Sequence, residues 1–98
     1  MKYRVEYLST FYADIVSFEK VLEEYPQMAR RILQKMDTKL SYLCEHPLMY
    51  PIYEDFPNFR KIVIEDYLLF YSINEHTKVI EVHRLIYGVT DVVRRLGD

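Results

Sequence analysis

Residues 59–71 read FRKIVIEDYLLFY, two apolar runs separated by the acidic pair Glu65–Asp66. Both runs are rich in β-branched and aromatic side chains, which favour extended strands. The acidic step between them predicts a turn, although the glycine and asparagine that usually mark tight turns are absent. We therefore expect a stiff two-stranded ribbon with Arg60 at the entrance of its first strand.

Two further segments show a strand pattern. Residues 2–8 alternate apolar and charged side chains, which predicts a half-buried strand. Residues 78–87, KVIEVHRLIY, follow the ribbon after the polar segment 74–77, so three consecutive strands form a meander. The strand at residues 2–8 must join that sheet or remain an unpaired edge.

The segment between the first strand and the ribbon is helical by its periodicity. Apolar residues recur at steps of three and four over residues 11–25 and again over residues 29–43. Ser9 or Thr10 offers an N-cap for the first helix. Pro26 separates the two runs and is tolerated at the first position of a helix, so we expect two tightly joined helices that form an antiparallel hairpin.

The predicted fold is a two-layer α+β domain with the order β-α-α-β-β-β and a helical hairpin on one face of a four-stranded antiparallel sheet. Residues 47–58 contain three prolines and are expected to be an extended loop. Residues 88–97 are expected to form a short terminal helix or a frayed tail. With 98 residues, half of them apolar, the chain suits a single domain over residues 1–98.

Membrane and secretory segments are not expected. No apolar run approaches the roughly 20 residues that a membrane helix needs. Charged residues interrupt the N-terminus where the apolar part of a signal peptide would lie. The lone cysteine, Cys44, permits no intrachain disulfide, so we expect a cytoplasmic protein.

The formal net charge of −2 differs from the basic excess of most nucleic-acid-binding domains. One segment departs from this balance, because Arg31, Lys35 and Lys39 recur at four-residue steps and would form a basic stripe along a helix. Most such stripes are solvated outer faces. The alternative is a contact surface for an acidic partner or a phosphate backbone.

The sequence holds none of the common catalytic or cofactor-binding motifs. There is no Gly-rich phosphate loop, CxxC, HExxH or GxSxG. The three histidines are scattered among a predicted helix end, a turn and a strand. We therefore expect neither a metal site nor a small-molecule cofactor.

The last predicted strand mixes apolar and polar side chains on both faces, and such breaks in a local rule often mark a functional place. Arg84 lies in an apolar row and needs a carboxylate partner or a ligand. An ion pair with Glu65, Asp66 or Asp91 is the structural explanation. The functional one is that Arg60 converges with Arg84 near Tyr87, because two guanidinium forks and a phenol ring suit phosphates and a stacked base.

The element order, with FRKIVIEDYLLFYSINE followed by IEVHRLIYGVTD, resembles the RelE/ParE toxin superfamily. The resemblance covers nearly the whole chain, and its specific part is the C-terminal third. It implies the toxin of a bacterial type II toxin–antitoxin module for plasmid stabilisation (addiction), which inhibits growth. A cognate antitoxin, usually encoded next door, neutralises such a toxin with a segment that folds on binding. RelE-like members cut mRNA on the ribosome by acid–base catalysis, whereas ParE-like members poison DNA gyrase.

The segment YGVTD at residues 87–91 and the motif YLLFY at residues 67–71 favour the ParE-like branch. Family members commonly carry a histidine where Tyr87 stands. RelE-like nucleases carry an arginine where Val89 and Thr90 stand, and a tyrosine near Val93. The loss of these groups removes a charge stabiliser and an acid–base candidate for phosphoryl transfer.

By position, the resemblance places a candidate site at Arg60, Arg84, Tyr87 and Asp91, as a binding patch more than a catalytic set. An enzyme of this type would be a metal-free endoribonuclease with Arg60, Arg84 and Tyr87 as catalytic candidates. The alternative is that these side chains only brace the end of the sheet. The functions left open are a toxin that binds DNA gyrase, an mRNA interferase, and a degenerate module that binds only its antitoxin. In each case the basic stripe is a candidate for meeting an acidic antitoxin segment.

Overall fold

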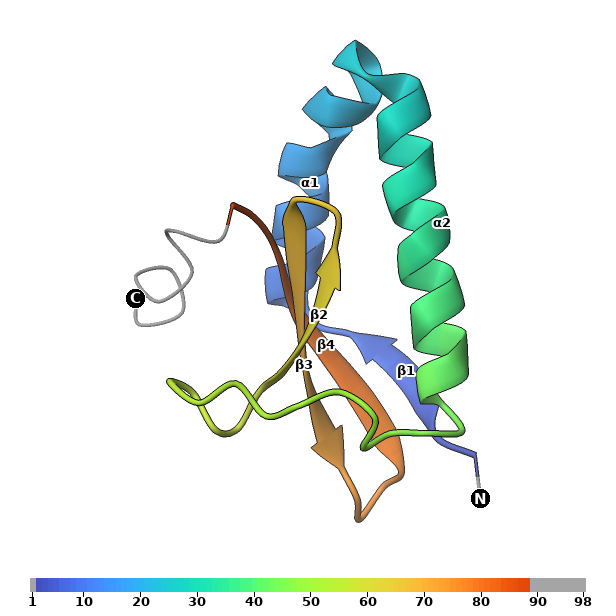
Figure 1. Cartoon of the computed structure of the whole chain (residues 1–98), viewed down its shortest axis with the longest axis vertical. Helices are drawn as coiled ribbons and strands as arrows, with labels where there is room; N and C mark the ends of the chain where they lie inside the picture. The colour runs from blue at the N-terminus through green and yellow to red at the C-terminus, as the bar shows by residue number, and fades with distance from the viewer. Residues whose placement is uncertain (1, 89–98) are drawn as a thin grey trace.

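The computed structural model describes residues 2–88, which form two helices and four strands in the predicted order (Figure 1). A hairpin of two helices packs against a four-stranded sheet, so the predicted α+β fold is confirmed. The terminal segment expected at residues 88–97 lies outside the described residues except for Gly88, and Asp91 lies outside them as well. The elements are β1 (Arg4–Tyr7), α1 (Ser9–Glu24), α2 (Pro26–Leu43), β2 (Arg60–Ile64), β3 (Tyr67–Asn74) and β4 (Val79–Tyr87).

The strands lie in the order β1-β4-β3-β2, and the β2–β3 and β3–β4 hairpins are antiparallel as predicted. The first strand differs, because β1 pairs with β4 in parallel, from Arg4 opposite Val79 to Tyr7 opposite Val82. The expectation of an all-antiparallel sheet was therefore wrong, and the sheet is mixed.

The parallel pairing follows from the connection between β1 and α1. Leu8 alone separates the two elements, which is too short to reverse the chain, so α1 continues in the general direction of β1 (Figure 1). Each of the four later connections reverses the chain. An even number of reversals brings β4 back in the direction of β1.

The core lies between the helices and one face of the sheet. Both helices direct their periodic apolar residues inward, as their spacing predicts. The strands contribute alternate residues to the same face. Its buried members include Phe11, Phe18, Ile32, Met36, Leu40 and Leu43 from the helices, and Ile62, Ile64, Tyr67, Leu69, Tyr71, Ile80 and Val82 from the sheet.

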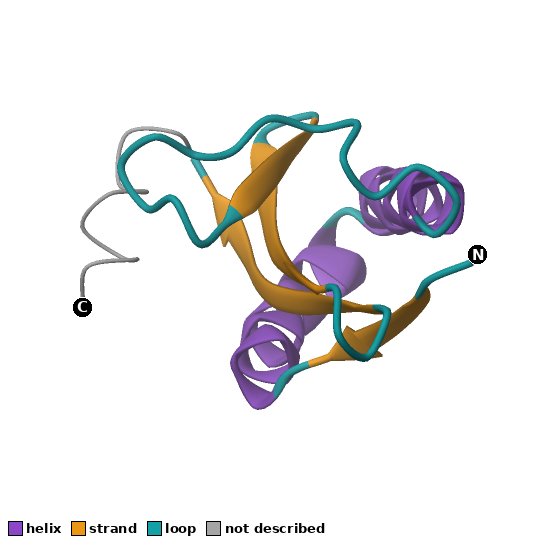
Figure 2. Cartoon of the chain, turned by 90° about the horizontal axis from the view of Figure 1, so that it is seen from below, coloured by secondary structure: helices purple, strands orange, loops and turns teal. Residues whose placement is uncertain are grey.

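The opposite face of the sheet has a smaller apolar cluster formed by Leu68, Phe70 and Ile86. The loop between α2 and β2 leaves the helical layer and crosses to the strands, where Tyr53 and Phe59 pack on this cluster (Figure 2). The Tyr53 N–H donates to the Phe59 carbonyl at 2.8 Å, which closes the loop on itself. The expected extended loop is therefore a compact strap whose aromatic side chains cover the second face.

A β-bulge explains the mixed pattern of β4. On β3, Phe70 lies opposite Arg84 and Tyr71 lies opposite Val82, so His83 has no partner residue there. The extra residue shifts the alternation by one, and Leu85 joins Val82 in the core on the helical side. Simple period-two counting, which puts Leu85 and Val82 on opposite faces, fails here for that reason.

Candidate functional site

Arg84 is bound by a carboxylate of α1. Its Nε and Nη2 donate to the two Asp14 oxygens at 2.8 and 3.1 Å, a two-pronged contact that raises the pKa of the guanidinium. The Arg84 side chain is 27% exposed and that of Asp14 is 16% exposed. A carboxylate partner was one of the alternatives left open for Arg84, and the structure shows one, but the candidates Glu65 and Asp66 were wrong. Asp91 lies outside the described residues.

The Asp14 contact belongs to a wider replacement of the sheet edge by α1. Strand β1 ends opposite Val82, which leaves the following backbone groups of β4 without a neighbouring strand on that side, while β3 continues to pair on the other. The Thr10 hydroxyl donates to the His83 carbonyl at 2.6 Å, and the Leu85 N–H donates to Asp14 Oδ2 at 2.8 Å. Neither Ser9 nor Thr10 caps α1 with its side chain, so the N-cap prediction was wrong. Side chains of α1 thus satisfy the edge groups that β1 no longer reaches.

Arg60 is bound at a different place. Its Nη1 donates to the Tyr50 carbonyl at 2.6 Å, in the segment that follows α2. The nearby Tyr71 hydroxyl is buried without a hydrogen-bond partner among the described residues, and burial raises its pKa. Arg60 pairs across the sheet with Tyr71, which faces the helices, whereas Arg84 pairs with Phe70, which faces the opposite side, so the structure does not bring the two guanidinium groups into one site.

Tyr87 is 60% exposed at the end of β4, and its ring meets Tyr67 edge-on with 5.2 Å between the ring centroids. The two rings line a groove of about 420 Å³ between the helical hairpin and the sheet. We call it the aromatic groove, and its other lining residues are Asp14, Ser17, Phe18, Val21, Tyr25, Met28 and Leu85. Of the three predicted patch residues that the structure describes, Arg60, Arg84 and Tyr87, only Tyr87 is exposed.

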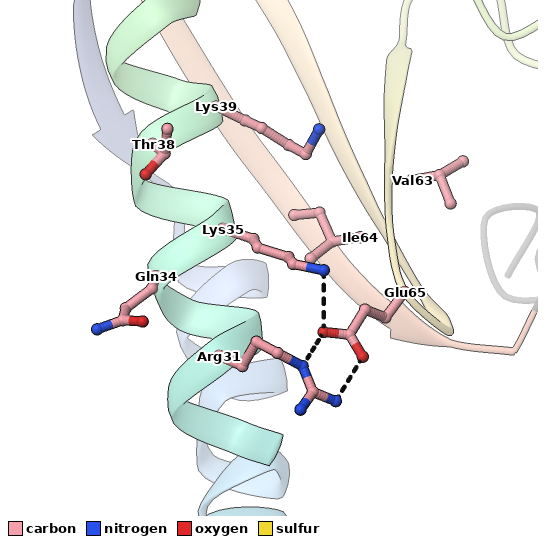
Figure 3. Close-up of a pocket in the computed structure, with 8 residues that line it drawn as sticks. All are labelled: Arg31, Gln34, Lys35, Thr38, Lys39, Val63, Ile64 and Glu65. Carbon is pink, nitrogen blue, oxygen red and sulfur yellow. Dashed lines mark hydrogen bonds and ion pairs between the residues drawn. The ribbon is translucent and has the colours of Figure 1, made fainter. Parts of the chain in front are cut away.

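The basic stripe lies along α2 where the helix faces β2, the edge strand of the sheet. Figure 3 shows Arg31 and Lys35 reaching toward Glu65, while Lys39 extends over the space between helix and strand. The stripe therefore borders a cleft of about 580 Å³, which we call the basic groove. Its remaining lining residues are Gln34, Thr38, Val63 and Ile64.

Glu65, in the turn between β2 and β3, is the internal partner of the stripe. Arg31 Nε and Nη2 lie 2.7 and 2.8 Å from its two oxygens, and Lys35 Nζ lies 3.4 Å from Oε2. The hydrogen bonds from Arg31, with a smaller contribution from Lys35, lower the pKa of Glu65 to about 2. The carboxylate therefore stays charged at every physiological pH.

A polar cluster on the sheet was not predicted. The Ser72 hydroxyl lies 2.7 Å from His83 Nε2 and 3.4 Å from Glu81 Oε1. Burial lowers the pKa of His83, which packs edge-on against Phe59. The cluster follows from the pairing of Ser72 with Glu81 across β3 and β4. That pairing depends on the strand register, which the sequence alone does not reveal.

Residues 2–88 hold no group of three or more His, Cys, Asp or Glu side chains arranged to bind a metal ion. Within the same residues no helix is long and apolar enough to cross a membrane.

The helical hairpin on a mixed sheet matches solved structures. A chain of the RelBE2 toxin–antitoxin complex from Mycobacterium tuberculosis aligns with a TM-score of 0.61. The alignment covers 89% of this chain and 99% of that one, at 15% sequence identity. The chain therefore has the RelE/ParE-like toxin fold.

The family model described as the ParE toxin of the type II toxin–antitoxin system parDE matches residues 5–92. The chain belongs to this ParE toxin family. No curated protein sequence matches it significantly. The superfamily and the preference for its ParE branch are confirmed.

Proposed function

We propose that this ParE-family toxin inhibits growth by binding a target protein such as DNA gyrase, and that a cognate antitoxin neutralises it. The observation that carries the choice of a binding mechanism is the engagement of both candidate arginines. Arg84 gives two donors to Asp14, and Arg60 gives one to a backbone carbonyl. The two guanidinium groups are therefore held at different places, and Arg84 is already paired with a carboxylate.

The competing function, metal-free RNA cleavage, needs positive side chains that converge on one phosphate. Freeing Arg84 would leave the partly buried Asp14 carboxylate without its charge partner, which is costly. Arg60, which bonds to the Tyr50 carbonyl, would in addition have to turn toward Arg84. Tyr87 is exposed, but a single phenol supplies neither the charge nor the acid–base pair of that reaction.

Tyr87 and the aromatic groove are the proposed target surface. Tyrosine provides a large, rigid contact area with a polar tip, and aromatic residues dominate the energetics of protein interfaces. The groove is largely apolar and lies between two structural layers, where binding sites commonly form.

The antitoxin is assigned to the other groove. Three cations of the basic stripe face a single carboxylate there, which favours an acidic segment that orders on docking. Separate surfaces for target and antitoxin would let one variant lose toxicity without losing neutralisation.

The test is inducible expression of the toxin alone, with DNA and RNA integrity measured in parallel. We expect growth arrest and DNA damage signalling while messenger RNA remains whole, and the purified protein should inhibit supercoiling by gyrase. Tyr87→Ala should abolish both effects. Tyr42→Ala is the matched control, because Tyr42 is 55% exposed on α2, away from the aromatic groove, and should leave both effects unchanged.

Two results would contradict the proposal. Transcripts cut within translated regions, with cutting lost in Arg60→Ala or Arg84→Ala, would establish an mRNA interferase. Harmless overexpression of correctly folded protein would establish a degenerate antitoxin-binding module. Failure of the neighbouring gene product to co-purify with this chain would remove the antitoxin assignment.

A further inference from the structure

The basic groove contains a negative group that the chain itself supplies. Glu65 has a φ of +53°, in the left-handed region that favours glycine or asparagine. A glutamate costs more there than either of those residues. The side-chain contacts that Glu65 makes across the groove offset this conformational cost.

Those contacts form a carboxylate clamp, defined here as Arg31 together with Lys35. The arginine fork meets both oxygens, and the lysine approaches one of them. The contacts found for this carboxylate run from side chain to side chain, and the Arg31 side chain is 54% exposed. Since no backbone N–H within residues 2–88 donates to the Glu65 carboxylate, another carboxylate can occupy the same fork without breaking the main-chain framework.

The groove holds more positive charge than Glu65 neutralises. Lys39 lies one helical turn beyond Lys35 and makes no ion pair within residues 2–88. Val63 on β2 is 57% exposed at the rim of the groove, with its side chain on the side of the strand that faces away from α2 (Figure 3). Cations at one-turn spacing along α2, with an exposed apolar residue at the rim of the same groove, suit a peptide that mixes acidic and apolar side chains.

We propose that the clamp is a carboxylate-binding site that Glu65 fills in the free toxin, and that an acidic side chain of the antitoxin displaces Glu65 on docking. The identity of the partner rests on the proposed function, whereas the site itself rests on the groove. Glu65 is then a built-in competitor. It lowers the apparent affinity for acidic segments by the fraction of time that it occupies the clamp.

The experiment measures binding of a fluorescein-labelled octapeptide of alternating glutamate and valine to the purified full chain by fluorescence anisotropy. We expect Glu65→Gln to bind this peptide about tenfold more tightly than the unaltered chain, because the competitor is removed. Adding Arg31→Gln and Lys35→Gln to that variant should weaken binding at least about tenfold, because both clamp cations are lost. Thermal unfolding of each variant checks that it remains folded.

The matched control is Glu75→Gln, which makes the same change of charge in the exposed turn between β3 and β4. It should gain much less affinity than Glu65→Gln, since it alters only the long-range charge of the protein. Equal affinity of the two variants for the peptide would overturn the proposal.

The outcome is independent of toxicity. Loss of the proposed gyrase inhibition would leave peptide binding unaffected. A failure of Glu65→Gln to bind more tightly would leave the proposed toxin activity standing.

Discussion

Two carboxylate–guanidinium contacts lie at different margins of the sheet, Asp14 with Arg84 and Glu65 with Arg31. Their shortest donor–acceptor distances, 2.8 and 2.7 Å, are nearly the same. They differ in surroundings, because Asp14 also accepts the Leu85 N–H and ties α1 to β4. The Arg84 side chain is half as exposed as that of Arg31. Bond geometry alone therefore does not distinguish a structural ion pair from an exchangeable one. The two are distinguished by the burial of the side chains and by hydrogen bonds to the backbone.

The largest effect is expected from Asp14→Ala. The change leaves Arg84 without its charge partner and the Leu85 N–H without an acceptor. We expect a loss of about 2 kcal/mol in the free energy of unfolding, in the range for a partly buried pair that loses one member. Urea unfolding followed by circular dichroism measures it.

Asp14→Asn provides the control for that change, since it keeps an oxygen for the Leu85 N–H and removes only the charge. Asp14→Asn should reduce the free energy of unfolding by about half as much as Asp14→Ala does. If Glu65→Ala proved as destabilising as Asp14→Ala, the distinction between the two contacts would be wrong.

The next largest effect is expected from Thr10→Val, which keeps the shape of the side chain and removes its hydroxyl. The His83 carbonyl then loses the donor that α1 supplies. We expect a loss of about 1 kcal/mol, typical for one hydrogen bond. An unchanged unfolding midpoint in urea would show that solvent replaces Thr10 and that α1 does not substitute for a strand at this edge.

A smaller, pH-dependent effect is expected at Glu65. Its pKa is about 2 in the folded protein and lies near the ordinary value of 4.5 when the chain is unfolded. A lowered carboxylate pKa stabilises the fold fully above the unfolded value, and that stability is lost as the pH falls toward 2. The difference in stability between the unaltered chain and Glu65→Gln should therefore be constant from pH 5 to 7 and shrink below pH 4.5. Thermal unfolding at a series of pH values measures it, and a difference that persists at pH 2 would contradict this contact.

The smallest effect is expected at His83, the extra residue of the bulge in β4. Burial lowers its pKa below 6.5, and the nearby Glu81 only partly offsets that shift. The folded state then binds fewer protons than the unfolded state, so acidification through this range reduces stability. His83→Gln should reduce the loss of stability between pH 7 and pH 5 measured by urea unfolding, whereas an identical loss in both proteins would exclude His83 as its cause.

The order and type of the elements could be predicted from the sequence because their periodicity is local. The parallel pairing of β1 could not, since it depends on the short connection at Leu8 and on the number of reversals that follow. The bulge at His83 was hidden for a related reason, because it is visible only once β3 and β4 are in register.

For the candidate site, the residue types could likewise be predicted from the sequence, whereas the pairings between them could not. A basic stripe and an acidic turn are both evident in the sequence, but nothing local shows that Glu65 faces Arg31. The apolar neighbours of Arg84 in the sequence suggested a carboxylate partner, but that partner, Asp14, lies 70 residues away on a helix. Counting along the chain favours nearer acids such as Asp66, whereas packing of α1 on β4 decides the pairing.

The parallel contact of β1 with β4 also has a consequence for synthesis of the toxin. The first strand to leave the ribosome must wait for Val79 and the residues after it before it can pair. Native structure at the centre of the sheet is therefore completed only after β4 has been translated, and contacts between such distant segments form slowly. The helical hairpin, whose contacts are closer in sequence, can form before the sheet to which it packs is complete.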